Sequence, residues 1–298
     1  MCLKLSASYA SIGCSCASVY PSLVLLSVVL ITYNEEANLA RTLQSVTPLV
    51  RNGQGEVIVV DSGSTDSTPE IAQSFGAKVF SEEWKGFSAQ KNSAIAKASG
   101  DWVLSLDADE EVSDELAKGI ENVLINPPQE HKFRQGSKPI FLNACWVQRR
   151  NYFLRRWIRH GGFWPDAKLR FFRRGTAQFK DTPVHETLTV QEPAKGFPDA
   201  YGHLPGYLVH HSYPTLSGYI EHMNRYSSLG AEIAAAKGHC TFSFKDVVLR
   251  PAATFIYNYF LRLGFLDGKE GLLLHLYHAS YVSWKYAKAW EMSGNAHK

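Results

Sequence analysis

Short apolar runs alternate with segments of helical periodicity over the first 126 residues. Four short runs are predicted to be strands: 25–31, 56–60, 77–80 and 102–106. The first has the continuous apolarity of a strand buried on both faces of a sheet. The segments between them carry apolar residues at the spacing of one helical face, as at Leu39, Leu43, Val46 and Val50. This alternation predicts βαβ units and a doubly wound, mostly parallel sheet of an α/β protein.

Capping residues and prolines mark where the helices between these strands begin and end. Asn34 is placed to cap the first helix, and Pro69 stands at the first position of the second. A third helix is predicted at about 87–98. Ser113 is placed to cap a fourth, which ends at Asn126 before two prolines. These signals give every strand of the predicted sheet a helix to follow it.

The pattern changes after Pro128. Shorter strands separated by Gly- and Pro-rich turns are expected at 144–148, 169–173 and 188–190. Beyond Pro214 the chain is predicted to be helical, first with one apolar face and then with two aromatic-rich segments, 246–265 and 270–291. The chain therefore divides into an α/β part and a carboxy-terminal helical region.

Composition places the chain among ordinary globular proteins. Its 298 residues are 45% hydrophobic and 20% charged, which excludes a disordered or collagen-like chain. Five cysteines without a C-x-x-C pair give neither a disulfide framework nor a zinc site, so a reducing cytosol is expected. A net charge of +3 is too small to indicate nucleic-acid binding. The apolar run 251–261 is shorter than the roughly 20 residues of a membrane-spanning helix.

The charges are unevenly distributed along the chain. Residues 101–121 hold eight acidic side chains against Lys118, and residues 149–174 hold nine basic ones against Asp166. Arginines interleaved with Trp and Phe favour contact with phosphates or with lipid head groups. A solvated surface explains each single arginine equally well. The segment as a whole is expected to meet an anion.

Three polar clusters follow strands of the predicted sheet: 32–35, 61–66 and 107–109. Ligands of doubly wound sheets bind beyond the carboxyl ends of the strands, so we expect these clusters to share one crevice. Asp107 and Asp109 could hold a hard divalent cation whose shell substrate phosphates complete. The alternatives are helix capping for this pair and an Asx-rich turn for 61–66. The absence of G-x-G-x-x-G disfavours a nicotinamide dinucleotide site, and the first strand lacks a dehalogenase-like phosphatase nucleophile.

Three motifs of this sequence resemble the signatures of family-2 glycosyltransferases of the GT-A type: residues 26–36 (LSVVLITYNEE), 59–66 (VVDSGSTD) and 107–109 (DAD). Four further segments are similar to the bacterial lipopolysaccharide core glucosyltransferase branch: 164–166, 170–174, 184–186 and 264–268. The resemblance covers about residues 25–290. We therefore expect an amino-terminal extension (1–24), a GT-A catalytic domain (25–212) and a carboxy-terminal helical, membrane-interfacial region (213–298).

The resemblance also implies the roles of site residues. Residues expected at the nucleotide are Thr32, Glu35, Asp61, Lys91 and Asp107. Of these, Asp107 is expected near the ribose and donor sugar and takes part in catalysis. Asp109 is expected to hold Mg²⁺ or Mn²⁺ against the diphosphate. For the catalytic base we expect Glu186, with Asp181 as the alternative, while an ordinary surface acid at a strand end is the competing interpretation of Glu186.

The activity implied is inverting transfer of a hexose, glucose foremost, from a nucleotide-diphosphate sugar to a lipopolysaccharide-core or other lipid-linked saccharide. A polyprenyl-phosphate sugar transferase is a variant of this expectation. A non-catalytic sugar-nucleotide or membrane-binding scaffold is the alternative from another class. Aromatic residues between basic ones in 245–290 favour a peripheral protein on the cytoplasmic face of the inner membrane, although core packing explains any single aromatic.

Overall fold

The structure is a computed structural model that describes residues 25–126, 142–180, 187–190 and 201–294. The expected extension 1–24 lies outside the described residues. Among the described residues, one sheet has the strand order β3-β2-β1-β4-β8-β6-β11-β5, with β7 on β6, and β9 and β10 form a hairpin. The strands are β1 (Leu26–Thr32), β2 (Gly55–Asp61), β3 (Lys78–Ser81), β4 (Trp102–Asp107), β5 (Glu110–Val112), β6 (Ala144–Phe153), β7 (Arg156–Trp157), β8 (Ala167–Arg173), β9 (Ala177–Lys180), β10 (Thr187–Val190) and β11 (Tyr201–Tyr213).

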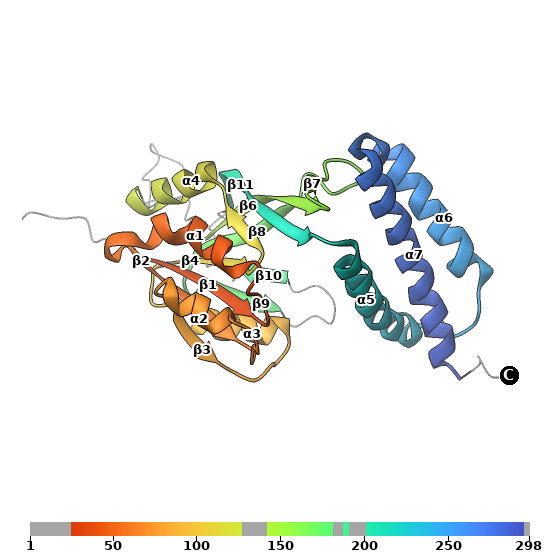
Figure 1. The fold of residues 1–298 in the computed structure, drawn as a ribbon, viewed down its shortest axis with the longest axis horizontal. Helices are drawn as coiled ribbons and strands as arrows, with labels where there is room; N and C mark the ends of the chain where they lie inside the picture. Colours follow the sequence, from red (N-terminus) through yellow and green to blue (C-terminus); the bar gives the residue numbers. More distant parts are fainter. Residues whose placement is uncertain (1–24, 127–141, 181–186, 191–200, 295–298) are drawn as a thin grey trace, which may run out of the picture.

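Helices flank the sheet and make up the end of the chain (Figure 1). The α-helices are α1 (Leu39–Val50), α2 (Thr68–Ser74), α3 (Phe87–Ala96), α4 (Asp114–Ile125), α5 (Leu216–Ala236), α6 (Arg250–Phe255) and α7 (Gly268–Met292). Two π-helical turns, Lys245–Leu249 and Ile256–Leu261, extend α6 at both ends. Short 3₁₀ turns lie at Arg51–Gly53 and Gly264–Asp267. The expected helical region after Pro214 is therefore present.

The first four strands of the sheet are parallel, and antiparallel pairs enter from β8 onward. Apolar cores lie on both faces of this sheet. One core contains side chains of α1, α2 and α4, and the other contains side chains of α3 and of the β9–β10 hairpin. This is the doubly wound α/β arrangement that the alternation of apolar runs predicts, because a strand covered on both faces needs apolar residues at every position.

The helical region packs against itself and against the end of β11. Helix α5 leads from β11, and the ring of Tyr219 on α5 contacts the rings of Phe153 and Tyr213. Helices α5 and α7 lie side by side, with α6 on the far side of α7 from the sheet (Figure 1). No helix of the described part of the chain has the length and apolarity needed to cross a bilayer.

The fold differs from the sequence prediction most clearly at β11 and at Asn34, and the short strands β5, β7 and β9 were not predicted either. The longest strand of the described chain, β11, was not expected, because Gly202, Pro205 and Gly206 interrupt its pattern; the strand accommodates them through a register shift between His203 and Tyr207. Asn34 does not cap α1. The N-cap of that helix is Asn38, and Asn34 instead bonds to the loop after β2.

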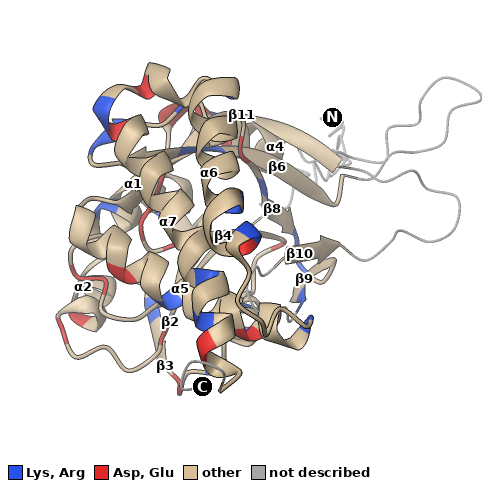
Figure 2. Ribbon diagram, turned by 90° about the vertical axis from the view of Figure 1, so that its right-hand side faces the viewer, with Lys and Arg blue, Asp and Glu red and all other residues tan. Residues whose placement is uncertain are grey.

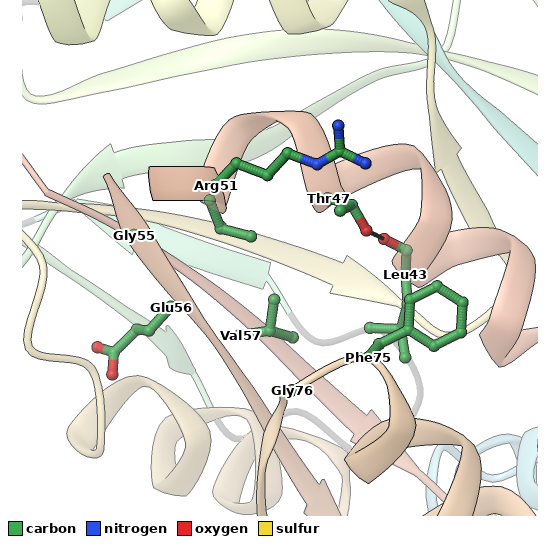
Figure 3. A pocket seen from close by; sticks show the side chains of 9 residues that line it. Leu43, Thr47, Arg51, Gly55, Glu56, Val57, Phe75 and Gly76 are labelled. Atoms are coloured by element: carbon green, nitrogen blue, oxygen red, sulfur yellow. Dashed lines mark hydrogen bonds between the residues drawn. The ribbon is translucent and has the colours of Figure 1, made fainter. Parts of the chain in front are cut away.

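A small hollow of about 250 Å³ lies at the amino end of the sheet (Figure 3). Gly55, the first residue of β2, and Phe75 line it, and the hydroxyl of Thr47 donates to the Leu43 carbonyl at its wall. Asp61 is the last residue of the same strand, about 20 Å away at 3.3 Å per residue. The hollow therefore lies at the opposite end of the strands from the acidic motifs.

Candidate active site

The three carboxylates expected to converge come to one edge of the sheet. Strand β1 lies between β2 and β4, and its last residues pair with the acids: Thr32 with Asp61 and Ile31 with Asp107. Two strand spacings separate the backbones of Asp61 and Asp107, a distance of about 10 Å. Asp109 follows in the turn between β4 and β5. Parallel pairing thus places all three at the carboxyl ends of neighbouring strands.

Asp61 organises the loop after β2. Its side chain is almost completely buried, and its Oδ1 accepts a hydrogen bond of 2.8 Å from the hydroxyl of Thr32. Its Oδ2 accepts from the backbone N–H groups of Gly63 and Ser64 at 3.0 and 2.8 Å. These are the bonds of an Asx turn, which the sequence offered as the structural alternative. Asp61 therefore fixes the shape of the loop after β2, and this structural role does not depend on a ligand.

The loop after β1 is joined to the loop after β2. Asn34 donates its backbone N–H to the hydroxyl of Ser64, and its side-chain carbonyl accepts from the N–H of Thr65, both at 2.8 Å. The next residue, Glu35, is also near the acids: burial raises its pKa, and the charges of Asp109 and Asp107 raise it further. Glu35 thus lies on the same side of the sheet edge as the D-x-D motif.

Asp107 belongs to a buried network of ion pairs. Its two oxygens contact Lys91 Nζ at 2.7 Å and Arg170 Nη2 at 2.5 Å. The same Arg170 nitrogen lies 2.8 Å from Glu110, a completely buried carboxylate that also pairs with Arg149 at 3.2 Å. The network links α3, β4, β5, β6 and β8. It joins the parallel half of the sheet to the mixed half at the site.

The cations determine the charge of Asp107. Burial alone would raise the pKa of this carboxyl, but Arg170 and Lys91 hold it well below its usual range. Burial opposes the charge of Arg170 too, and the pairing with Asp107 and Glu110 more than compensates, so the pKa of Arg170 is raised. Isolated buried charges are costly, whereas paired and hydrogen-bonded ones persist. Asp107 is therefore an ionised carboxylate held in one position.

The acidic segment 101–121 and the basic segment 149–174 meet in this network. The basic segment was expected to contact phosphates or lipid head groups. For Arg149 and Arg170 the structure gives protein carboxylates as partners instead. Arg150 stacks between the rings of Trp157 and Tyr207, with centroid distances of 4.2 and 3.3 Å. The aromatic residues among the arginines thus serve, at least here, to hold a guanidinium inside the fold.

Asp109 faces a histidine from the end of β11. His210 Nε2 lies 3.3 Å from Asp109 Oδ2, and His210 Nδ1 lies 2.7 Å from both Asn151 Oδ1 and Ser212 Oγ. The amide of Asn151 is oriented by its donation to Asp166 at 3.0 Å. Its oxygen therefore points at His210 and accepts from Nδ1–H. Nε2 then faces Asp109 with its lone pair in the neutral ring and with an N–H in the charged ring, and pairing with His210 outweighs burial and lowers the pKa of Asp109.

Two lone-pair donors that face each other at this distance need a proton or a cation between them. A carboxylate oxygen and an imidazole nitrogen are both ligands of Mn²⁺ and related divalent ions. Among the described residues, no cluster of three or more metal-binding side chains is present. Asp109 and His210 could thus supply two ligands, and oxygens of a bound diphosphate and water would supply the others, as is usual for Mg²⁺ at phosphate sites.

The proposed catalytic bases, Glu186 and Asp181, both lie outside the described residues. The sequence prediction also missed site residues that the structure places here: Glu110, Arg149, Asn151, Arg170 and His210. Arg149 and Asn151 are two apart on β6, so they share one face of the strand. That polar spacing was the available signal for these two. No local signal pointed to His210, because the interruptions in β11 concealed the strand.

Comparison with known proteins gives the family. A model of glycosyl transferase family 2 matches residues 27–129. An uncharacterized glycosyltransferase of Rickettsia typhi is 30% identical over 272 residues, which cover 90% of this chain and 87% of that protein. The chain belongs to glycosyltransferase family 2. This chain is also 27% identical to the lipopolysaccharide core biosynthesis glycosyltransferase LpsC of Rhizobium meliloti, and the match covers 82% of each of the two chains.

Among solved structures, the mannosyltransferase PcManGT of Pyrobaculum calidifontis, in complex with GDP-Man and Mn²⁺, is similar over 89% of this chain and 86% of that chain, with 17% identity and a TM-score of 0.46. Family membership confirms the expectation drawn from the three motifs, that this chain is a glycosyltransferase with a nucleotide-sugar donor. The α/β sheet followed by a helical region is the arrangement that this expectation implied.

Replacing Arg170 by Leu is expected to destabilise the glycosyltransferase strongly. The change removes the cation that Asp107 shares with the completely buried Glu110 and leaves them with Lys91 and Arg149 alone; breaking a buried ion pair costs up to about 3–5 kcal/mol of unfolding free energy. Lys85→Leu is the control, because Lys85 forms an exposed pair with Glu82 and should cost no more than about 1 kcal/mol. Urea unfolding at pH 7 measures both variants. If both variants lost the same unfolding free energy, the ion-pair network would not stabilise the fold as described.

The same variant should change the pH dependence of stability. The folded pKa of Asp107 is below its unfolded value, so its ionisation stabilises the fold fully above about pH 4 and progressively less as the pH falls through the folded pKa. In Arg170→Leu the depression of this pKa is reduced. The urea midpoint should therefore decrease less between pH 6 and pH 2 in this variant than in the unmodified enzyme.

Asn151→Leu is expected to weaken Mn²⁺ binding by about 10- to 100-fold, the usual effect of removing a group that orients a metal ligand. The variant removes the acceptor that fixes the tautomer of His210 without touching Asp109. Asn122→Leu on the exposed surface of α4 is the matched control. Titration calorimetry with Mn²⁺ and a nucleoside diphosphate gives the affinities. Equal affinities in both variants would mean that Asn151 has no part in the metal site.

Proposed function

We propose that this glycosyltransferase transfers a hexose, with inversion, from a nucleotide-diphosphate sugar to a lipopolysaccharide-core or other lipid-linked saccharide acceptor. The observation that carries the proposal is the facing pair of Asp109 and His210, 3.3 Å apart and beside the ion-paired Asp107. Such a pair could supply two ligands to a divalent cation that also binds the diphosphate of an activated sugar. The similarity to LpsC over most of both chains supports the lipopolysaccharide core as the acceptor class.

Each side chain at the sheet edge has a role in this proposal. Thr32, Asp61 and Glu35 shape the nucleotide pocket, and Lys91 approaches the nucleotide while it holds Asp107. Asp107 is held ionised near the ribose and the donor sugar. Asp109 and His210 would hold Mg²⁺ or Mn²⁺, and a bound cation would supply Lewis-acid stabilisation of the charge on the departing nucleoside diphosphate.

The acceptor hydroxyl attacks the anomeric carbon from the face opposite the diphosphate. The bond from the acceptor oxygen to this carbon forms as the bond to the diphosphate oxygen breaks, so a single displacement inverts the configuration. Glu186 is our candidate to accept the proton of the acceptor hydroxyl, and Asp181 is the alternative. An α-linked donor then gives a β-linked product. A lipid-linked acceptor places this reaction at the cytoplasmic face of the inner membrane.

The proposal is tested by release of nucleotide from a panel of UDP-, GDP- and ADP-hexoses with a core saccharide acceptor and Mg²⁺ or Mn²⁺. One donor should be consumed, and EDTA should stop the reaction. Asp109→Ala is expected to lower the turnover by about 10³-fold, the equivalent of roughly 4 kcal/mol of lost charge stabilisation. Asp114→Ala, on the exposed first turn of α4, should retain full activity.

Full activity of the Asp109→Ala variant, or full activity of the unmodified enzyme in EDTA, would refute the metal-assisted mechanism. Circular dichroism of both variants checks that neither has unfolded. If no donor and acceptor give turnover, a non-catalytic sugar-nucleotide or membrane-binding scaffold becomes the better interpretation.

Glu186→Gln is expected to keep the affinity for the donor and to lower kcat by about 10²- to 10⁴-fold, because the amide cannot accept the proton of the acceptor hydroxyl. Donor affinity is measured by calorimetry and kcat by nucleotide release. Asp181→Asn serves as the comparison. If only the second variant loses turnover, Asp181 is the base and the assignment of Glu186 is wrong.

A further inference from the structure

The segment that contains α6, residues 244–266, has one covered side and one open side. Its covered side packs on α7, where Pro251 is buried, the hydroxyl of Ser283 donates to the Val247 carbonyl and Arg250 donates to the hydroxyl of Tyr286. Its other side points away from the sheet, as Figure 1 shows. Only this outward side is available to a partner.

The outward side is apolar along its whole length. Six of its large side chains are between 52% and 70% exposed: Phe244, Leu249, Ile256, Tyr257, Phe260 and Leu261. Figure 2, which looks onto this side of the molecule, shows few charged positions along the ribbon of α6. Isolated exposed apolar residues are ordinary, but an apolar surface that continues from residue 244 to residue 261 marks an interaction site. We call these six residues the apolar face.

Charged residues around the apolar face indicate its partner. Lys245 and Arg262 lie within the segment and Lys269 follows it, and the nearby acids have partners within the protein. Asp246 pairs with Arg250 at 2.7 Å, and Asp267 is buried. A twofold dimer through this face would bring the same basic rims together. An anionic lipid surface would instead offer phosphates to the basic residues and an acyl boundary to the apolar ones.

The helical region is attached firmly to the catalytic part, so docking here would hold the active site at the membrane. Asp267 accepts hydrogen bonds from the backbone N–H groups of Arg159 and His160 at 3.1 and 2.8 Å. The N–H of Gly161 donates to the carbonyl of Arg262 at 2.8 Å. These bonds join the end of the α6 segment to the loop after β7. The anchor and the active site are thus parts of one packed structure.

We propose that the apolar face of residues 244–266 lies in the plane of an anionic membrane surface, with its aromatic and aliphatic side chains inserted at the head-group boundary and its basic rim on lipid phosphates. The membrane contact deepens the proposed function, because it would bring the enzyme to a lipid-linked acceptor. Vesicle binding by this surface needs neither donor nor acceptor, so it can be measured independently of the proposed function.

The experiment is co-sedimentation of the full chain with vesicles of phosphatidylcholine and phosphatidylglycerol at low salt. Leu261→Asp and Phe260→Asp are expected to weaken vesicle binding at least about tenfold each, because a charge cannot enter the acyl boundary. The matched control is Ile125→Asp. Ile125 is 74% exposed on α4, away from this face, and its replacement should leave binding unchanged. Vesicles of phosphatidylcholine alone, or 0.5 M salt, should bind less.

Equal vesicle binding by Leu261→Asp and Ile125→Asp would overturn the proposal, as would failure of the unmodified chain to bind anionic vesicles. A dimer in solution that Leu261→Asp dissociates, seen by light scattering, would also overturn it in favour of a second copy as the partner. Nucleotide release with a water-soluble saccharide acceptor should be unchanged in Leu261→Asp. If the unmodified chain binds anionic vesicles but releases no nucleotide from any donor, the proposed function is wrong and the proposed membrane surface stands.

Discussion

The arrangement of the active site depends on the pairing of buried charges. Glu110 is completely buried, and no solvent reaches it to stabilise its charge. Arg170 bridges it to Asp107, and Arg149 contacts it from the neighbouring strand. Since an uncompensated charge at this depth would be costly, the packing of the strands that carry these residues is most stable with all the partners present. The requirement fixes the position of the turn that carries the D-x-D motif.

The two halves of the sheet make different contributions to the site. The parallel half brings Asp61 and Asp107 to one edge through its register, as in doubly wound sheets generally. The mixed half adds Arg170, which together with Lys91 on α3 keeps Asp107 ionised, and β11 adds His210 opposite Asp109. The site therefore exists only where the halves meet. The mixed half thus holds the D-x-D motif of this family-2 glycosyltransferase in place.

The parts of the fold with strong local signals could be predicted from the sequence. The apolar runs gave the parallel strands, and Ser113 caps α4 as expected, with its hydroxyl accepting from the N–H of Leu116. Predictions that depended on distant residues were less successful. Asn34 looked like a helix cap, but its partner Thr65 is 31 residues away. The acidic and basic segments were interpreted separately, although Asp107 and Arg170, 63 residues apart, neutralise each other. Strand β11 was missed because pairing with β6 and β5 overrides its glycines and proline.

The central claim is that a divalent cation binds between Asp109 and His210 at the sheet edge. Pulsed electron paramagnetic resonance of the protein with Mn²⁺ and a nucleoside diphosphate tests it most directly. The account predicts nitrogen modulation from one imidazole together with phosphorus couplings, and loss of the nitrogen signal in His210→Gln. Bound Mn²⁺ with phosphorus couplings but no nitrogen modulation in the unmodified enzyme would contradict it.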